Sequence, residues 1–185
     1  MKLEKYIYLF FVAISVYVFA SCHQTSAQEQ RDAEKDLLKK YIKKYHPDVY
    51  PQASGLYVVH SKEGTGDSVA NGNYVKIFYR GYLIEDNDTM GVQDGYMFDA
   101  SGSYEPFGFT VGTGSVIEGW DEAILHMKQG GMAKWIVPST IAYGGANQGT
   151  IPPYSTLVFY VHVLKVYRTT DTFQTIQKVP RQYLN

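Results

Sequence analysis

The sequence contains few of the residues that disulfide, metal or nucleotide chemistry needs. A single cysteine, Cys22, excludes an internal disulfide bond, and the five histidines are scattered without the spacing of metal ligands. No nucleophile stands beside a base in a recognisable motif, and no glycine-rich phosphate loop occurs. The 17 basic and 18 acidic residues give a net charge of −1, which offers no electrostatic reason to bind nucleic acid. We therefore expect no metal, no cofactor and no nucleic-acid partner.

The main apolar run, residues 6–20, is shorter than the roughly 20 apolar residues that a bilayer-spanning helix needs. Lys2 and Lys5 precede it, and it leads into Ala20-Ser21-Cys22. A basic start, a short apolar centre and small residues before a cut are typical of a secretion signal. The small-small-Cys ending resembles a bacterial lipobox. The sequence therefore predicts a lipoprotein signal peptide over residues 1–21, with cleavage before Cys22.

A lipid on the sulfur of Cys22 would attach the exported chain to a membrane. The next residue, His23, is not the acidic residue that retains some lipoproteins at the inner membrane. We therefore expect an outer-membrane protein that faces the periplasm. The alternative is ordinary signal-peptidase cleavage after Ala27, which would give a secreted chain without a lipid.

Residues 22–54 read as a polar tether followed by an amphipathic helix over residues 31–45. Pro47 ends the helix, because the residue before a proline avoids the α region. The apolar stripe of this helix is expected to pack on the following domain or on a second copy of the helix, which would make a homodimer. The opposite face is expected to be solvated, with contact to a membrane surface as the alternative. The apolar stripe contains Leu37, Leu38, Tyr41, Ile42 and Tyr45, and the basic face contains Lys35, Lys39, Lys40, Lys43 and Lys44.

From residue 55 onward the apolar pattern alternates as in β-strands, apart from one short helix over residues 120–127. Strands are expected over residues 56–60, 74–84, 107–111, 132–137 and 156–166. The acidic, turn-rich residues 86–95 are expected to form a loop or bulge. The pattern predicts an α+β fold, in which a twisted antiparallel sheet of about five strands wraps around one short α-helix and an N-terminal helix is added.

Three segments of this region carry aromatic residues next to glycines, in a fixed order. They are Phe98-Asp99-Ala100-Ser101, Val116-Ile117-Glu118-Gly119-Trp120 and Ala142-Tyr143-Gly144. In these segments, and in Phe78-Tyr79-Arg80-Gly81 and Pro106-Phe107-Gly108-Phe109, residues 55–167 resemble the FKBP-type peptidyl-prolyl cis-trans isomerases, the macrolide-binding immunophilins. The resemblance ends before the tail, residues 168–185.

This resemblance implies an apolar cup between the sheet and the short helix, with tryptophan as its floor. Its substrates would be polypeptides with Xaa-Pro bonds, and macrolides would be its inhibitors. The donors would be the Ile117 N–H and the Tyr143 hydroxyl, and Asp99 would orient the substrate without acting as a base. Carried over by motif, the catalytic residues are Tyr79, Asp99, Ile117, Trp120 and Tyr143, and the substrate-binding residues are Phe98, Phe107, Val116, Ile151 and Phe159.

Two hypotheses follow for the function. The first is an isomerase that assists the folding of exported proteins, because proline isomerisation can limit the rate of folding. The second is a chaperone or assembly module of an envelope complex that uses the same pocket for binding without turnover. The loop between Tyr143 and Pro152 is about one residue shorter than is usual in the family, so macrolide affinity does not follow from the resemblance.

Overall fold

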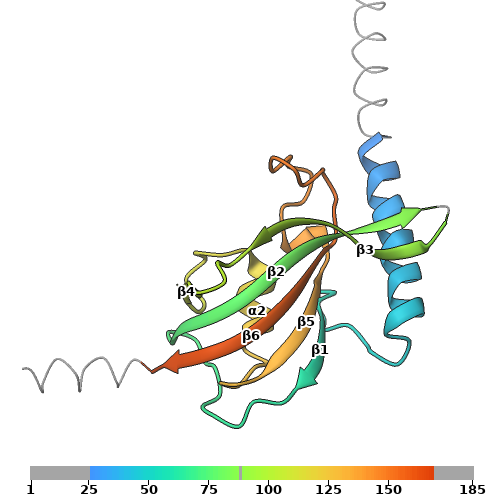
Figure 1. Ribbon diagram of the computed structural model, residues 1–185. Helices are drawn as coiled ribbons and strands as arrows, with labels where there is room; N and C mark the ends of the chain where they lie inside the picture. Colours follow the sequence, from blue (N-terminus) through green and yellow to red (C-terminus); the bar gives the residue numbers. More distant parts are fainter. Residues whose placement is uncertain (1–25, 88, 169–185) are drawn as a thin grey trace, which may run out of the picture.

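The computed structural model describes residues 26–87 and 89–168 (Figure 1). The predicted signal peptide, the lipidation site Cys22 and the tail from residue 169 lie outside the described residues.

An antiparallel sheet of six strands forms the body of the chain. The strand order is β1-β5-β6-β2-β3, and β4 pairs with the first part of β2. The sheet curls around the short helix α2, Glu118–Ile124 (Figure 1). The predicted α+β architecture is therefore confirmed. The strands are β1 Tyr57–Lys62, β2 Tyr74–Asn87, β3 Gly91–Ala100, β4 Phe107–Thr110, β5 Met132–Val137 and β6 Leu157–Tyr167.

Side-chain alternation along the two central strands sends one set of apolar residues into the core that α2 covers. Val75 and Ile77 of β2 are fully buried there, and Leu157 and Val163 of β6 lie in the same core. Successive side chains of a strand point to opposite faces, so this face is continuous across the sheet. We call it the inner face, and the opposite one the outer face.

Helix α2 is shorter than the sequence pattern indicates and begins two residues earlier. After Ile124, the N–H groups of Leu125, His126 and Met127 each bond to the carbonyl three residues back, at 3.2, 3.2 and 3.0 Å. Such i to i−3 bonds belong to a tighter helical turn, which commonly ends an α-helix. Met127 lies beyond the end of the helix but is buried, as its spacing from the other apolar residues indicated.

Of the predicted loop or bulge over residues 86–95, the loop is wrong, whereas the pairing register does shift next to Asp94, between the pairs Tyr82–Met97 and Ile84–Asp94. Strands β2 and β3 continue through this region as a hairpin, and Asn87 pairs with Gly91 across its tip. Ile84 and Val92 of the hairpin are buried on the outer face, where the N-terminal helix covers them. Tertiary packing thus overrides the low strand propensity of acidic residues.

The N-terminal helix, residues 26–45, lies across one end of the outer face, beside the β2–β3 hairpin (Figure 1). Tyr41 is fully buried, and Leu37, Leu38 and Ile42 pack around it against the sheet. Of the two predicted places for the apolar stripe, the structure has the chain's own domain, while a homodimer stays a prediction. Among residues 26–87 and 89–168, no helix is both long and apolar enough to cross a membrane.

On the basic face of this helix, Lys40 pairs with Asp86 at 2.9 Å and Lys44 donates to the carbonyls of Met90 and Val92. These two lysines contact the β2–β3 hairpin of the same chain. Both lysines are nonetheless exposed, so the expected solvated face is present while two of its lysines also contact the hairpin.

Candidate active site

A cavity of about 220 Å³ opens between the inner face of the sheet and α2. Strands β2, β3, β4 and β6, the loop before α2 and the loop after β5 all contribute to it. Nine of the ten residues singled out from the sequence line this cavity: Tyr79, Phe98, Asp99, Phe107, Val116, Ile117, Trp120, Tyr143 and Phe159. The tenth, Ile151, is buried in the core and does not line it. Ser115 also lines the cavity, and no motif in the sequence singled it out.

Trp120 forms the floor of the cavity and is only 5% exposed. The rings of Tyr79 and Phe159 meet it edge-on, with centroids at 4.8 and 5.0 Å. Phe107 stands 5.8 Å away in a similar orientation. The indole N–H is buried and finds no acceptor among the described residues. The floor is therefore a largely buried aromatic surface.

Two glycines allow the aromatic rings and the helix to come this close. A Cβ on Gly81 would lie 2.7 Å from the ring of Phe98 and 2.9 Å from that of Phe159. A Cβ on Gly119 would lie 2.4 Å from Val137 Cγ1, so the glycine lets α2 sit directly on β5. Any larger residue at either position would push the cavity apart.

The rim carries one carboxylate and two phenols. The Tyr79 hydroxyl donates to Asp99 Oδ2 at 2.6 Å, and the Ala100 N–H donates to the other carboxylate oxygen at 2.8 Å. Burial, together with the hydrogen bond to Asp99, raises the pKa of Tyr79 above its ordinary value. Burial and the charge of Asp99 raise the pKa of Tyr143 in the same direction. Both phenols therefore stay protonated near neutral pH and can donate hydrogen bonds.

The loop before α2 presents a backbone donor to the cavity. Ile117 precedes the helix in an extended conformation, and its carbonyl accepts from the Trp120 N–H at 2.9 Å. Its own N–H finds no acceptor within the part of the chain that the structure describes. Asp121 fixes this loop, because its carboxylate accepts from the N–H groups of Gly112 and Gly114 at 2.8 and 3.1 Å. The sequence signal for this role was an acid in the first helical turn with two glycines upstream.

Tyr143 comes from the segment that joins β5 to β6, just after the short 3₁₀ helix η1, Ser139–Ile141. Gly144 has a φ of 57°, a backbone conformation that glycine adopts without strain. This glycine turns the chain directly after Tyr143. Tyr143 is 37% exposed and remains open to a ligand.

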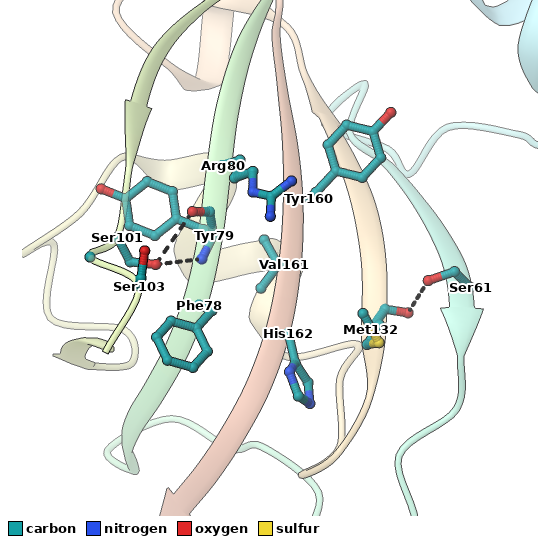
Figure 2. A pocket seen from close by; sticks show the side chains of 11 residues that line it. Ser61, Phe78, Tyr79, Arg80, Ser101, Ser103, Met132, Tyr160, Val161 and His162 are labelled. Atoms are coloured by element: carbon teal, nitrogen blue, oxygen red, sulfur yellow. Dashed lines mark hydrogen bonds between the residues drawn. The ribbon is translucent and has the colours of Figure 1, made fainter. Parts of the chain in front are cut away.

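A larger hollow, about 500 Å³, lies on the outer face over β2, β6, β5 and β1 (Figure 2). Its lining includes Arg80, Tyr160 and His162 together with three serines, and no helix forms a floor beneath it. Figure 2 also shows Ser101, whose hydroxyl accepts from the Tyr79 N–H at 3.0 Å and so fastens the loop after β3 to β2. We assign the site to the smaller cavity, because the aromatic rings and the polar rim converge there.

No acid–base pair or nucleophile suited to bond cleavage lines the smaller cavity. Within residues 26–87 and 89–168, no group of three or more histidine, cysteine, aspartate or glutamate side chains is arranged to hold a metal ion. The arrangement can bind an apolar ring over Trp120 and donate hydrogen bonds to carbonyl groups on either side of it.

Comparison with known proteins agrees with this geometry. A family model described as FKBP-type peptidyl-prolyl cis-trans isomerase matches residues 66–164. The chain is 38% identical over 115 residues to an FK506-binding protein of Neisseria meningitidis serogroup B, covering 61% of this chain and 97% of that protein. It is 41% identical over 115 residues to the peptidyl-prolyl cis-trans isomerase Fkbp12 of Drosophila melanogaster, covering 60% and 98%.

Solved structures extend the likeness to the fold. A peptidyl-prolyl cis-trans isomerase from Pseudomonas syringae pv. tomato superimposes with a TM-score of 0.62 at 29% identity, covering 76% of this chain and 96% of that one. FkpA from Escherichia coli gives a TM-score of 0.62 at 31% identity, covering 87% and 71%. The motifs, the fold and these relatives lead to one conclusion: the chain belongs to the family of FKBP-type peptidyl-prolyl cis-trans isomerases.

Proposed function

We propose that this chain catalyses rotation about Xaa-Pro peptide bonds in exported proteins, with the proline ring seated on Trp120. The observation that carries the proposal is the aromatic floor, in which Tyr79, Phe107 and Phe159 surround the indole edge-on. A proline ring is apolar and compact, and such a floor excludes the water that would otherwise solvate the peptide group.

The chemistry requires no proton transfer. Rotation is slow because the twisted transition state loses amide resonance, at a barrier of roughly 18–20 kcal/mol. The planar amide is the more charge-separated form, so an apolar cavity disfavours it relative to the twisted form. The Ile117 N–H and the Tyr143 hydroxyl would hold the carbonyl groups on either side of the bond. Asp99 would orient Tyr79 and the substrate at the rim.

The remaining cavity residues would contact the substrate through apolar surface: Phe98, Phe107, Val116 and Phe159. Relatives are named FK506-binding proteins, so we propose that a macrolide of that kind competes for the same cavity. Ile151 is left out of this contact set, because it packs in the core. It would support the segment that carries Tyr143.

The export part of the proposal rests on the sequence of residues 2–22, which resembles a lipoprotein signal. A Cys22→Ala variant should lose the lipid and leave the membrane fraction, or remain unprocessed. If Cys22→Ala fractionates like the parent chain, and the parent chain carries no lipid in the same cells, the predicted lipid anchor is wrong.

An exchange assay on a proline-containing peptide tests the catalytic part. The full chain should accelerate cis-trans exchange, which takes tens to hundreds of seconds uncatalysed. FK506 should suppress the acceleration. Peptide binding without any acceleration would contradict the isomerase and favour a binding module.

A further inference from the structure

Glu34 of the N-terminal helix contacts the segment that carries Tyr143, although 105 residues separate it from the first point of contact. Its Oε1 accepts from the Ser139 N–H at 2.7 Å and from the Thr156 hydroxyl at 2.8 Å. Its Oε2 accepts from the Ser139 hydroxyl at 2.6 Å. Glu34 lies outside the stretch that matches the family model, residues 66–164. The contact is therefore made by an addition to the common domain.

Ser139 and Thr156 mark the two ends of the segment between β5 and β6. They are 2% and 4% exposed, so their hydroxyls need partners within the protein. One carboxylate serves both, and hydrogen bonds to a charged acceptor are the stronger kind. Glu34 thus ties the beginning of the segment to its end.

Backbone hydrogen bonds connect Ser139, which Glu34 holds, to the residues on both sides of Tyr143. The Ser139 carbonyl accepts from the N–H groups of Ala142 and Gly144, the two neighbours of Tyr143, at 3.0 and 2.8 Å. The Gly144 carbonyl in turn accepts from the Tyr154 N–H at 2.7 Å. Any shift of Ser139 would therefore move the backbone on both sides of Tyr143.

The helix also touches the segment near its far end. The guanidinium of Arg31 lies 5.2 Å from the centre of the Tyr154 ring. Tyr154 has a φ of 55°, which makes it the one residue other than glycine with a positive φ among the described residues. Non-glycine residues keep such a conformation where the surroundings impose it. Arg31 and Glu34 stand one turn apart, so a single helix edge contacts the segment at Ser139, Tyr154 and Thr156.

We propose that Glu34 is a positioning residue for prolyl isomerisation, which holds the segment between β5 and β6 so that Tyr143 faces the cavity. This inference rests on the proposed isomerase function. The N-terminal helix then has a part in the reaction although none of its residues lines the cavity.

The expected kinetic effect concerns substrate binding more than turnover. Without Glu34 the segment samples other arrangements, and only a fraction of molecules has Tyr143 in place. The apparent affinity for the substrate falls in proportion to the fraction of molecules with Tyr143 in place. Once the substrate is bound, Tyr143 is in place and turnover proceeds as in the parent chain. We therefore expect Glu34→Ala to raise KM about tenfold and to change kcat less than about threefold.

The test measures kcat and KM for an Xaa-Pro peptide in the full chain. Glu34→Gln retains an acceptor oxygen and should restore most of the loss, and Thr156→Val should give a smaller rise in KM. Asp36→Ala removes an exposed carboxylate of the same helix and should change nothing. Tyr41→Phe loosens the helix at its other end and should lower stability without raising KM. Equal KM values for Tyr41→Phe and Glu34→Ala at matched loss of stability would overturn the proposal.

Amide hydrogen exchange gives a readout that does not depend on activity. In Glu34→Ala and Thr156→Val, the amides of Ala142, Gly144 and Tyr154 should exchange faster, while core amides of β6 should not. In Glu34→Gln the same amides should exchange nearly as in the parent chain. If the wild-type chain has no isomerase activity but these amides respond, the proposed function fails and the positioning contact stands. Unchanged exchange in Thr156→Val contradicts the inference, and this result does not depend on whether Glu34→Ala folds. An unchanged KM for a folded and active Glu34→Ala variant contradicts it as well.

Discussion

Tyrosine–carboxylate pairs stand on both faces of the sheet, and their surroundings differ. On the outer face, Asp94 accepts from the hydroxyls of Tyr41 and Tyr160 and pairs with Lys134 at 3.5 Å. On the inner face, Asp99 accepts from the hydroxyl of Tyr79 and from no other side chain among residues 26–87 and 89–168. The first carboxylate has its partners supplied by the fold and lies under the N-terminal helix. The second is exposed at the rim of a cavity.

The difference separates a structural network from a binding site. A partly buried polar network is most stable when every member is satisfied, and Asp94, Tyr41, Tyr160 and Lys134 meet that condition. Around Trp120 the donors that a ligand needs are left available instead, among them the Ile117 N–H. Changes on the outer face should therefore alter stability, and changes on the inner face should alter activity.

The largest effect is expected from Trp120→Ala on the inner face, which should lower both activity and stability. It removes the floor and opens a void, so activity should be lost and the free energy of unfolding should fall by ~3–5 kcal/mol. Urea unfolding together with the peptide exchange assay checks both. A folded variant with full activity would contradict the assignment of the floor.

The next effect is expected from Asp94→Asn on the outer face. It weakens three charge-assisted contacts, so the free energy of unfolding should fall by roughly 2–3 kcal/mol. Activity per folded molecule should stay as in the parent, which kinetics below the unfolding transition would reveal. If Asp94→Asn lost activity and kept its stability, the assignment of the outer face to stability and the inner face to activity would be wrong.

A smaller effect is expected from alkaline pH. Burial, followed by the hydrogen bond to Asp94, raises the pKa of Tyr41 and of Tyr160 above the ordinary value near 10. The folded state then holds these protons more tightly than the unfolded chain. Stability is complete below about pH 10 and falls as the pH rises above it. Tyr79 on the inner face contributes in the same way, because its pKa is raised too. Urea unfolding from about pH 8 to pH 11 should show the fall, and Tyr41→Phe and Tyr79→Phe should each show less of it than the parent chain.

The smallest effect on the fold is expected from Tyr143→Phe. The side chain keeps its volume and loses only a rim hydroxyl, so stability should change by less than about 0.5 kcal/mol. The value of kcat/KM should fall by about three- to tenfold, the equivalent of one neutral hydrogen bond. Unaltered kinetics would show that this hydroxyl does not contact the substrate.

The parts of the fold that follow local rules were predicted from the sequence. Alternation at Val75 and Ile77 gave the inner face, and the spacing around Trp120 gave the short helix. The cavity residues came through motif resemblance, and nine of those ten residues do line one cavity. Ile151 does not, because sequence order alone does not determine which side of a loop a residue packs on.

The individual contacts that the N-terminal helix makes with distant segments were not predicted, although its packing on the domain was one of two expectations. The β2–β3 hairpin reads as a loop because its acidic residues disfavour strands, and only packing of Tyr41 against Ile84 and Val92 explains it. Glu34 reads as one more acid that dilutes a basic helix face. Its role depends on Ser139 and Thr156, which no periodicity connects with it.

The measurement closest to the central claim is the pH dependence of Xaa-Pro isomerisation by the full chain, with Asp99→Asn in parallel. If the cavity acts by shape and desolvation, the chain accelerates exchange and kcat/KM stays flat between about pH 6 and pH 9. In that case Asp99→Asn is slower than the parent but still active. A bell-shaped profile with an inactive Asp99→Asn enzyme, or no acceleration at all, would contradict the account.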